Sequence, residues 1–309
     1  MIRQAAFARK GQFLKGALHC HTTRSDGSGS PEEVIRLHKK MGYDFLALTD
    51  HRLYNYENFA PETEITIIPG MEMDRDLPGP GIHCHHIVCI GPKKEDGNGF
   101  SQDETFSRKN ITTAAECQEM LDMIHAANNL TIYCHPEWSG ISAREFETLE
   151  GNFAMEIWNS GCVIEDGVDA NAAYWDELLI QGKKIFGVAT DDGHAMHQHC
   201  KGWVMVNAEN NIASILKALE NGEFYSTCGP EIYDFRVEEG VAIVECSPVS
   251  EIQFRHFRAP YRLAKSADGK NSLRAAHAVI REGTNYIRAV VTDAEGRRAW
   301  TNPIFLDER

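Results

Sequence analysis

The sequence predicts an α/β protein in two parts: a barrel of successive β/α units over residues 1–229 and a small β-sandwich-like domain over residues 230–309. Two observations predict this division. Short apolar runs alternate with amphipathic helical patterns from residue 17 onward, as they do in a chain of β/α units. After residue 229 the pattern changes to period-two alternation, which is typical of antiparallel strands with one exposed face.

Eight short apolar runs predict the strands of the first part. They lie at residues 16–20, 44–50, 65–73, 85–91, 130–136, 153–159, 184–191 and 202–208. The runs DFLAL and IFGVA are almost continuously apolar, which favours parallel strands covered on both faces. The Gly-rich polar segment 91–110 predicts a long loop between two of these strands.

Capping boxes predict where helices begin. In this signature a Ser or Thr precedes the helix and a Glu follows three residues later. Three such pairs occur: Ser30 with Glu33, Thr113 with Glu116, and Ser142 with Glu145. In the second part, residues 272–280 (SLRAAHAVI) predict a weak helix among strands.

Composition excludes several classes of partner. The formal net charge is −14 and no basic run occurs, which argues against a nucleic-acid or membrane-surface partner. The N-terminus lacks the apolar segment of a signal peptide, and no stretch is apolar enough to span a bilayer, so we expect a cytoplasmic protein. The nine cysteines form no CxxC pair, and most are expected to be reduced core residues.

The positions of the histidines are the main sequence evidence about function. Three His-x-His pairs occur, at His19/His21, His83/His85 and His197/His199, where composition alone predicts about 0.6. The first pair lies at the end of a predicted strand, and further ligand-type residues lie at the ends of other strands. These residues are Asp50 and His51, Glu72, His135, and Asp192 with His194.

Parallel strands in a barrel would bring those ends together on one face. Several imidazoles and carboxylates close together are costly when unpaired, whereas divalent cations would satisfy all of them. The alternative for each histidine taken alone is a solvated loop residue or a satisfied core group. Their recurrence at five strand ends favours a metal centre.

At this point the sequence resembles the polymerase and histidinol phosphatase (PHP) superfamily of metal-dependent phosphoesterases. The resemblance rests on LHCHTTRSDG followed by SPEE, and on LTDH, GMEM, HHIVCIG, YCHPEW and ATDDGH, and it covers residues 17–229. The tail AVVTDAEGRRAWTNPIF looks like the C-terminal β-domain of the branch that includes carbaryl hydrolases.

The resemblance implies a distorted seven-stranded (β/α)7 barrel that holds two or three divalent metal ions. The implied ligands are His19, His21, Glu72 and Asp192 for the first ion, Glu72, His86 and His135 for the second, and Asp26, His51 and His194 for the third. Among them, Glu72, Asp192 and His194 would be catalytic. Asp191 is an alternative to Asp192, and His83 and His85 are alternatives to His86, which directly precedes the apolar run.

Other residues would support this site. Ligand-orienting candidates are Asp50, Glu156 and Asp191. Five residues in loops after the motifs could hold an anionic group of the substrate, although such a residue taken alone is more often a solvated loop charge: Arg24, Arg52, His197, His199 and Lys201.

The predicted function is hydrolysis of a small-molecule phosphoester, mono- or diester, by in-line attack of metal-bound hydroxide. The mixed ligands suit Mn, Zn or Fe and do not select one. Three carboxylates against two or three dications leave the site positive, which suits a small anionic substrate. The alternatives are an ester or carbamate hydrolase that uses the same centre, and a non-catalytic metal-binding or regulatory module. The sequence does not predict the oligomeric state.

Overall fold

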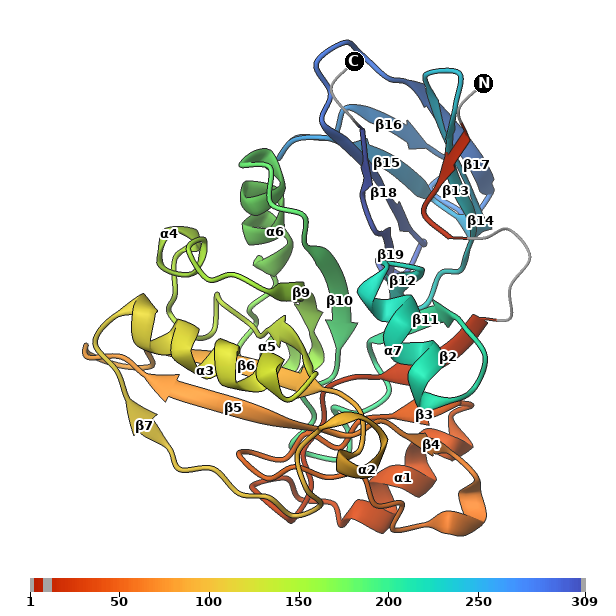
Figure 1. Ribbon diagram of the computed structural model, residues 1–309. Coiled ribbons are helices and arrows are strands. Elements are labelled where there is room, and N and C mark those ends of the chain that lie inside the picture. The colour runs from red at the N-terminus through yellow and green to blue at the C-terminus, as the bar shows by residue number, and fades with distance from the viewer. Residues whose placement is uncertain (1–2, 8–12, 307–309) are drawn as a thin grey trace.

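The computed structural model describes residues 3–7 and 13–306 and has a mixed α/β fold with three sheets (Figure 1). The six-stranded sheet has the order β10 (Phe186–Thr190), β9 (Asn152–Asn159), β8 (Leu130–Tyr133), β6 (Cys84–Ile90), β5 (Gly70–Asp76) and β7 (Lys109–Asn110). The ten-stranded sheet has the order β16 (Arg262–Lys265), β15 (Glu251–Arg255), β18 (Tyr286–Thr292), β19 (Arg298–Thr301), β12 (Phe224–Thr227), β11 (Trp203–Asn207), β2 (Phe13–Ala17), β3 (Phe45–Leu46) and β4 (Thr66–Ile67), with β20 (Ile304–Phe305) paired to β18.

The third sheet pairs a strand near the N-terminus with three strands of the C-terminal part. Its order is β1 (Arg3–Ala5), β13 (Ile232–Glu238), β14 (Val241–Val249) and β17 (Leu273–Val279). In Figure 1 the short red strand β1 lies against this C-terminal sheet, and it pairs antiparallel with β13. The ten-stranded sheet also runs without a break from β15 and β18 to β2. The C-terminal strands are therefore hydrogen-bonded to the rest of the fold.

Helices cover the sheets through apolar faces. They are α1 (Pro31–Lys40), the 3-10 turn η1 (Pro61–Thr63), α2 (Lys94–Gly97), α3 (Ala114–Ala126), α4 (Ala143–Phe146), α5 (Ser160–Glu165), α6 (Asn171–Ile180) and α7 (Ile212–Glu220). Capping boxes are present at Ser30, Thr113 and Ser142, as predicted. Helices α3 and α6 pack on the six-stranded sheet, and α7 packs on β11 and β12. All nine cysteines are free, and seven of them are buried, which confirms the prediction.

Two sequence-based expectations are wrong. Strands β5, β6 and β8 pair antiparallel, not parallel, because the connection from β5 to β6 is too short for a crossover helix. Residues 273–279 form strand β17 rather than a helix, because pairing with β14 outweighs the local helix preference.

The two larger sheets are mixed and do not close into one continuous barrel ladder, so the predicted (β/α)7 barrel is not confirmed. Isolated parallel bridges nevertheless join their neighbouring edges, at Cys20 with Gly193 and at His51 with Glu72. Both bridges lie beside predicted metal ligands. The strand ends that carry those ligands are therefore held together.

A buried ion pair links α6 to the C-terminal strands. The Arg288 guanidinium on β18 donates to Asp176 from Nε at 3.0 Å, and both side chains are almost fully buried. Arg288 also lies over the Trp175 ring at 4.5 Å, and Arg255 donates to the other Asp176 oxygen at 3.2 Å. Removing the carboxylate would leave a buried cation without its counter-ion.

We therefore expect Asp176→Ala to lower the free energy of unfolding by about 3–5 kcal/mol, the usual cost of breaking a buried ion pair. Urea denaturation measures this change. The matched control is Asp169→Ala, which removes the partner of the more exposed Arg298 and should cost less than about 1 kcal/mol. Equal losses in the two variants would contradict the role given to the buried pair.

Candidate metal centre

The predicted ligands come from loops at the ends of neighbouring strands. His19 and His21 follow β2, His51 follows β3, and Glu72 lies on β5. His86, His135 and Asp192 come from β6 and from the ends of β8 and β10. Most are fully buried. The sequence thus places imidazoles and carboxylates where apolar strands end, and the fold gathers them at one edge.

One group consists of His19, His21, Glu72 and Asp192, whose ligand atoms all lie within 4.8 Å of one another. The Nε2 atoms of His19 and His21 are each 3.1 Å from Asp192 Oδ1. His21 Nε2 is also 3.3 Å from Glu72 Oε2. This group is the one predicted for the first ion, and it includes Asp192 rather than Asp191.

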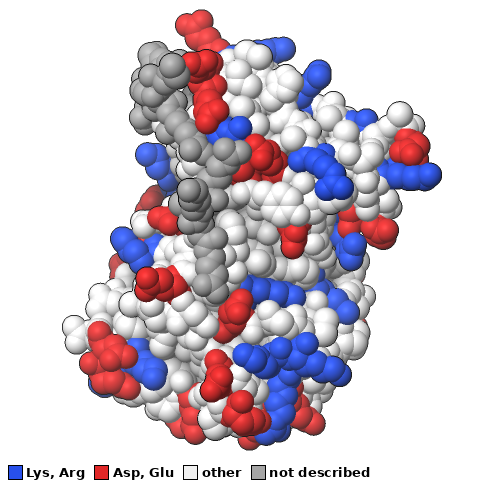
Figure 2. All heavy atoms as spheres, turned by 90° about the vertical axis from the view of Figure 1, so that its right-hand side faces the viewer, with Lys and Arg blue, Asp and Glu red and all other residues white. Residues whose placement is uncertain are grey.

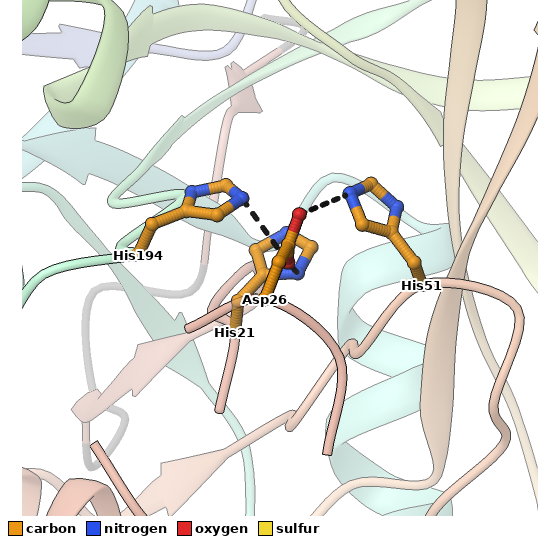
Figure 3. A group of neighbouring side chains, drawn as sticks. All are labelled: His21, Asp26, His51 and His194. Atoms are coloured by element: carbon orange, nitrogen blue, oxygen red, sulfur yellow. Dashed lines mark ion pairs between the residues drawn. The ribbon is translucent and has the colours of Figure 1, made fainter. Parts of the chain in front are cut away.

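A second, more exposed group surrounds Asp26. Figure 3 shows His21, His51 and His194 pointing toward this carboxylate from three segments of the chain. Asp26 Oδ2 is 3.4 Å from His51 Nε2, and Oδ1 is 3.5 Å from His194 Nε2. The group matches the set predicted for the third ion and adds His21, whose Nδ1 is 3.5 Å from Asp26 Oδ1.

Glu72 connects these two groups to the residues predicted for the second ion. Its Oε1 is 2.8 Å from His86 Nδ1 and 3.5 Å from His135 Nε2, and its Oε2 is 3.0 Å from His51 Nδ1. The Cys134 sulfur also lies within 4.8 Å of the Glu72 and His135 ligand atoms, although the residue was expected to belong only to the core. Glu72 is thus placed to bridge two ions.

Partners behind the rings fix their orientation. His19 Nδ1 lies 2.6 Å from Glu156 Oε1, His135 Nδ1 lies 3.0 Å from Ser139 Oγ, and His194 Nδ1 lies 3.0 Å from the Asp192 carbonyl oxygen. Each contact leaves Nε2 free to face the centre, which is the usual arrangement of metal-binding histidines. Glu156 occupies the orienting position that was predicted for it.

Asp50 and Gly27 shape the loop that carries the first histidines. Asp50 accepts hydrogen bonds from the Thr22 amide, the Thr22 hydroxyl and the Ser25 hydroxyl, each at 2.8 Å. A Cβ at Gly27 would lie 2.6 Å from the His21 carbonyl carbon, so only glycine lets the loop close this tightly. The Asp50 side chain therefore fixes the conformation of the loop that carries His21.

Two ligand residues adopt left-handed backbone conformations, His135 with φ +25° and Asp192 with φ +49°. Such conformations are costly for residues other than glycine and often mark functional sites. At these positions they turn the chain sharply at a strand end. The side chain can then point into the cluster.

The electrostatics of the cluster fit divalent cations. Burial alone would raise the pKa of Glu72, but the rings of His86, His19 and His51 outweigh burial and hold that pKa well below its usual range. Glu72 Oε2 and His51 Nδ1 are buried, and neither has a hydrogen-bond partner among the residues that the structure describes. Unpaired buried acceptors are expensive, and a cation between them would satisfy both.

Two cavities open onto the centre. The first, of about 500 Å³, is lined by Asp26, His51, Glu72, His86, His135, Asp192 and His194, together with Trp138, Gln198 and neighbours. The second, of about 460 Å³, shares Asp26, His51, His86 and Trp138 and continues past Arg52, Asp74 and Arg108. The two cavities share Trp138 and three candidate ligands, so a substrate in either one would meet Asp26, His51 and His86.

The residues predicted to contact the substrate are dispersed. Arg52 lines the second cavity and pairs with Asp74. Arg24 donates to Asn55 at 2.9 Å and pairs with Asp103. His197 and Lys201 are exposed, and His199 is buried.

Three further charged residues lie near the ligand cluster: Asp191, Asp74 and Arg108. Asp191 faces away from the ligand cluster and accepts hydrogen bonds from the amides of residues 200–202. Asp74 and Arg108 were not predicted as site residues. Strand periodicity could have found Asp74, because it lies two residues after Glu72 and faces the same side of β5.

Two further observations concern the nucleic-acid and membrane partners that the composition argues against. Acidic and basic side chains lie interspersed on the face drawn in Figure 2. Within residues 3–7 and 13–306, every helix is too short or too polar to span a bilayer.

Comparisons with known proteins agree with this geometry. Residues 17–226 match the family model of the PHP domain. Over 70 residues the chain is 40% identical to a 5'-3' exoribonuclease of Haemophilus influenzae, a match that spans 21% of this chain and 26% of that relative. The chain therefore covers about a quarter of the length of the curated relative it matches.

One of two solved structures compared with the chain supports the fold. A two-domain protein of Bacteroides vulgatus, described as containing a predicted PHP-like metal-dependent phosphoesterase, matches with a TM-score of 0.50 at 14% identity, over 97% of this chain and 88% of that one. An amidohydrolase of Chromobacterium violaceum with bound sulfate and no metal matches with a TM-score of 0.42 at 15% identity, over 59% of this chain and 88% of that one. At these identities the first likeness concerns the two-part fold alone.

Because Glu156 holds His19 in its ligand orientation, we expect Glu156→Gln to weaken metal binding about 10- to 100-fold. Titration of metal-free protein against a chromophoric chelator measures the affinity. The control is Glu150→Gln, which changes a surface carboxylate paired with Lys183. If both variants bind metal as tightly as the unmodified chain, Glu156 does not orient a ligand.

Proposed function

Because the chain belongs to the PHP domain family, we propose that its metal centre hydrolyses phosphoesters of small anionic molecules. The observation that carries the proposal is the convergence of His19, His21, Glu72 and Asp192 on one point beneath an open cavity. A buried site with this donor set binds divalent cations, and the cavity gives a small substrate access to it.

The chain offers three ligand groups, around Asp192, Asp26 and the pair Glu72 and His135, which supports two or three ions. Bound Mn, Zn or Fe would supply Lewis-acid stabilisation of phosphoryl oxygens and an attacking water of lowered pKa. Glu72 and Asp192 would be carboxylate ligands of these ions, with Glu72 near enough to contribute to two of them. His194 is partly exposed at the cavity and is placed to contact the reacting group.

Arg52 and Trp138 are the residues we assign to substrate recognition. Arg52 lines the second cavity next to the ligands, where its guanidinium can pair with an anionic oxygen. The Trp138 ring lies 5.1 Å from the His135 ring and lines both cavities, so it offers an apolar wall for the leaving group. A phosphoester with a ring-bearing leaving group would satisfy both.

The relative from Haemophilus influenzae supports a second candidate, a phosphodiester at the end of a ribonucleotide chain. The net charge of −14 and the interspersed surface charges favour a short substrate over a long nucleic acid. An ester or carbamate would use the same ligands, with attack on a carbonyl carbon.

We also propose that the strands of the two larger sheets that precede residue 230 form the distorted seven-stranded barrel of this family, closed at two isolated parallel bridges. The pairing of Cys20 with Gly193 and of His51 with Glu72 supports closure at those edges. Residues 230–309 would form the small second domain, to which β1 adds an edge strand.

Removal of metal should abolish turnover. We expect protein treated with a chelator to lose activity on an aryl phosphate and to regain it with Mn, Zn or Fe. Parallel assays with an aryl phosphodiester, a short oligoribonucleotide and an aryl carbamate separate the candidates. Full activity in the metal-free protein, or turnover of the carbamate alone, would overturn the phosphoesterase proposal.

Loss of His19 tests the ligand assignment directly. We expect His19→Ala to lose both bound metal and activity, by at least 100-fold in kcat/KM, because His19 contributes a ligand atom and contacts Asp192. Metal analysis and kinetics of the same sample measure both. The control is His125→Gln on α3, which bonds Thr131 and should leave both quantities unchanged.

A further inference from the structure

A second cluster of ligand-type side chains lies behind the metal centre. It consists of His38 on α1 and of Asp191 and His199 from the segment after β10, and their ligand atoms lie within 4.8 Å of one another. The three residues are 0%, 0% and 2% exposed. None of them belongs to the group around Glu72.

Three ring nitrogens in this cluster lack partners. His38 Nδ1 donates to the Val34 carbonyl at 2.8 Å, which directs Nε2 toward Asp191. The distance from Nε2 to Asp191 Oδ2 is 3.9 Å, too long for a hydrogen bond. Among the described residues neither His38 Nε2 nor either nitrogen of His199 has a hydrogen-bond partner.

Unpartnered buried nitrogens need an explanation, because each costs about 1–3 kcal/mol. An ion pair between His38 and Asp191 would satisfy one nitrogen and leave His199 unpaired. The His38 arrangement, with one ring nitrogen bound to a backbone carbonyl and the other free, is the one that metal-binding histidines adopt.

Cys200 supplies a fourth donor. Its thiol faces the His38 ring and the Tyr43 hydroxyl. Its backbone has φ +63°, a conformation that a cysteine rarely adopts. The Cys200 amide also donates to Asp191 Oδ2 at 2.6 Å, so the two residues are fixed relative to each other.

Asp191 is held rigidly for this role. The amides of Lys201 and Gly202 donate to its Oδ1 at 2.9 Å, and the Ser160 hydroxyl lies 3.2 Å from the same oxygen. These contacts occupy Oδ1, whereas Oδ2 accepts from the Cys200 amide and keeps a lone pair for a cation. A ligating carboxylate is usually held by hydrogen bonds in this way.

We propose that His38, Asp191, His199 and Cys200 bind one zinc ion at a structural site separate from the catalytic centre. Two imidazoles, a carboxylate and a thiolate form a tetrahedral donor set with no open position, which is typical of structural zinc. The carboxylate and the thiolate neutralise the dication, so the buried site carries no net charge. Ligand atoms of tetrahedral zinc lie about 3.4 Å apart, so binding requires the four side chains to move closer together than they lie here.

The site would join α1 to the segment that carries two catalytic-centre ligands. Asp192 and His194 follow Asp191 directly, and α1 follows the loop with His19, His21 and Asp26. Zinc binding releases the Cys200 thiol proton and contributes its free energy to folding. The ion would thereby stabilise the arrangement of both ligand-bearing segments.

Metal analysis of the full chain and its variants tests the proposal. We expect Cys200→Ser and His38→Gln each to bind one metal equivalent fewer than the unmodified chain. The matched controls Cys228→Ser and His125→Gln should lose none. Protein reconstituted with Co²⁺ should show a thiolate charge-transfer band in the near ultraviolet that is absent from Cys200→Ser. Equal metal content in all variants, or no such band in the unmodified chain, would overturn the proposal.

A second measurement needs no variant. With zinc bound, alkylation of Cys200 by iodoacetamide, followed by peptide mass spectrometry, should slow at least tenfold relative to Cys228. An unchanged ratio with and without zinc would overturn the site even if the variants fail to fold. Phosphoesterase turnover measured on the same samples reports separately on the catalytic centre.

Discussion

The structure depends on the pairing of one buried carboxylate. Glu72 is 1% exposed and lies within 3.5 Å of ring nitrogens from five histidines, which belong to segments following β2, β3 and β8 and to strand β6. A carboxylate removed from water must be compensated, and among the described residues these five histidines lie near enough to do so. The strands must therefore end at the same edge, so the requirement that arranges the ligands also constrains how the two larger sheets meet.

The sequence could predict most of the ligands because they follow apolar runs, and the place where a buried strand ends is visible in the pattern of residues. His86 instead precedes its run, and Asp26 was predicted through the PHP resemblance. All nine predicted ligands come together, and the PHP resemblance is confirmed. Whether neighbouring strands run parallel or antiparallel was harder to predict from the sequence. A run such as HHIVCIG has the same composition in a parallel or an antiparallel pair, and only the short connection from β5 to β6 distinguishes them. Strand β17 was missed because its stability comes from pairing with β14, 24 or more residues away.

The substrate residues were harder to predict because a loop charge finds its partner through tertiary contacts. Arg24 and Arg52 both follow ligand motifs, yet Arg24 is tied to Asn55 and Asp103 while Arg52 lines a cavity. Nothing in their local sequence separates them. Arg108 reaches the second cavity from residues that the sequence indicated only as a polar loop, and it is held there by Asp76 at 2.6 Å. The local sequence therefore predicts the candidate ion ligands, whereas long-range packing determines which residues line the cavities.

The adjacent residues Asp191 and Asp192 lie in one turn, but their side chains contact different partners. With φ +49° at Asp192, the backbone reverses direction, so that Asp192 faces His19 and His21 while Asp191 faces Ser160 and the amides of residues 200–202. Asp192 therefore faces the candidate ligands, and Asp191 fixes the conformation of the segment that also carries His194. Since the two side chains point to opposite sides, changes at these neighbouring positions affect different properties: ligand loss at Asp192, and loss of segment order at Asp191. This separation explains how a sequence with two consecutive candidates can use both.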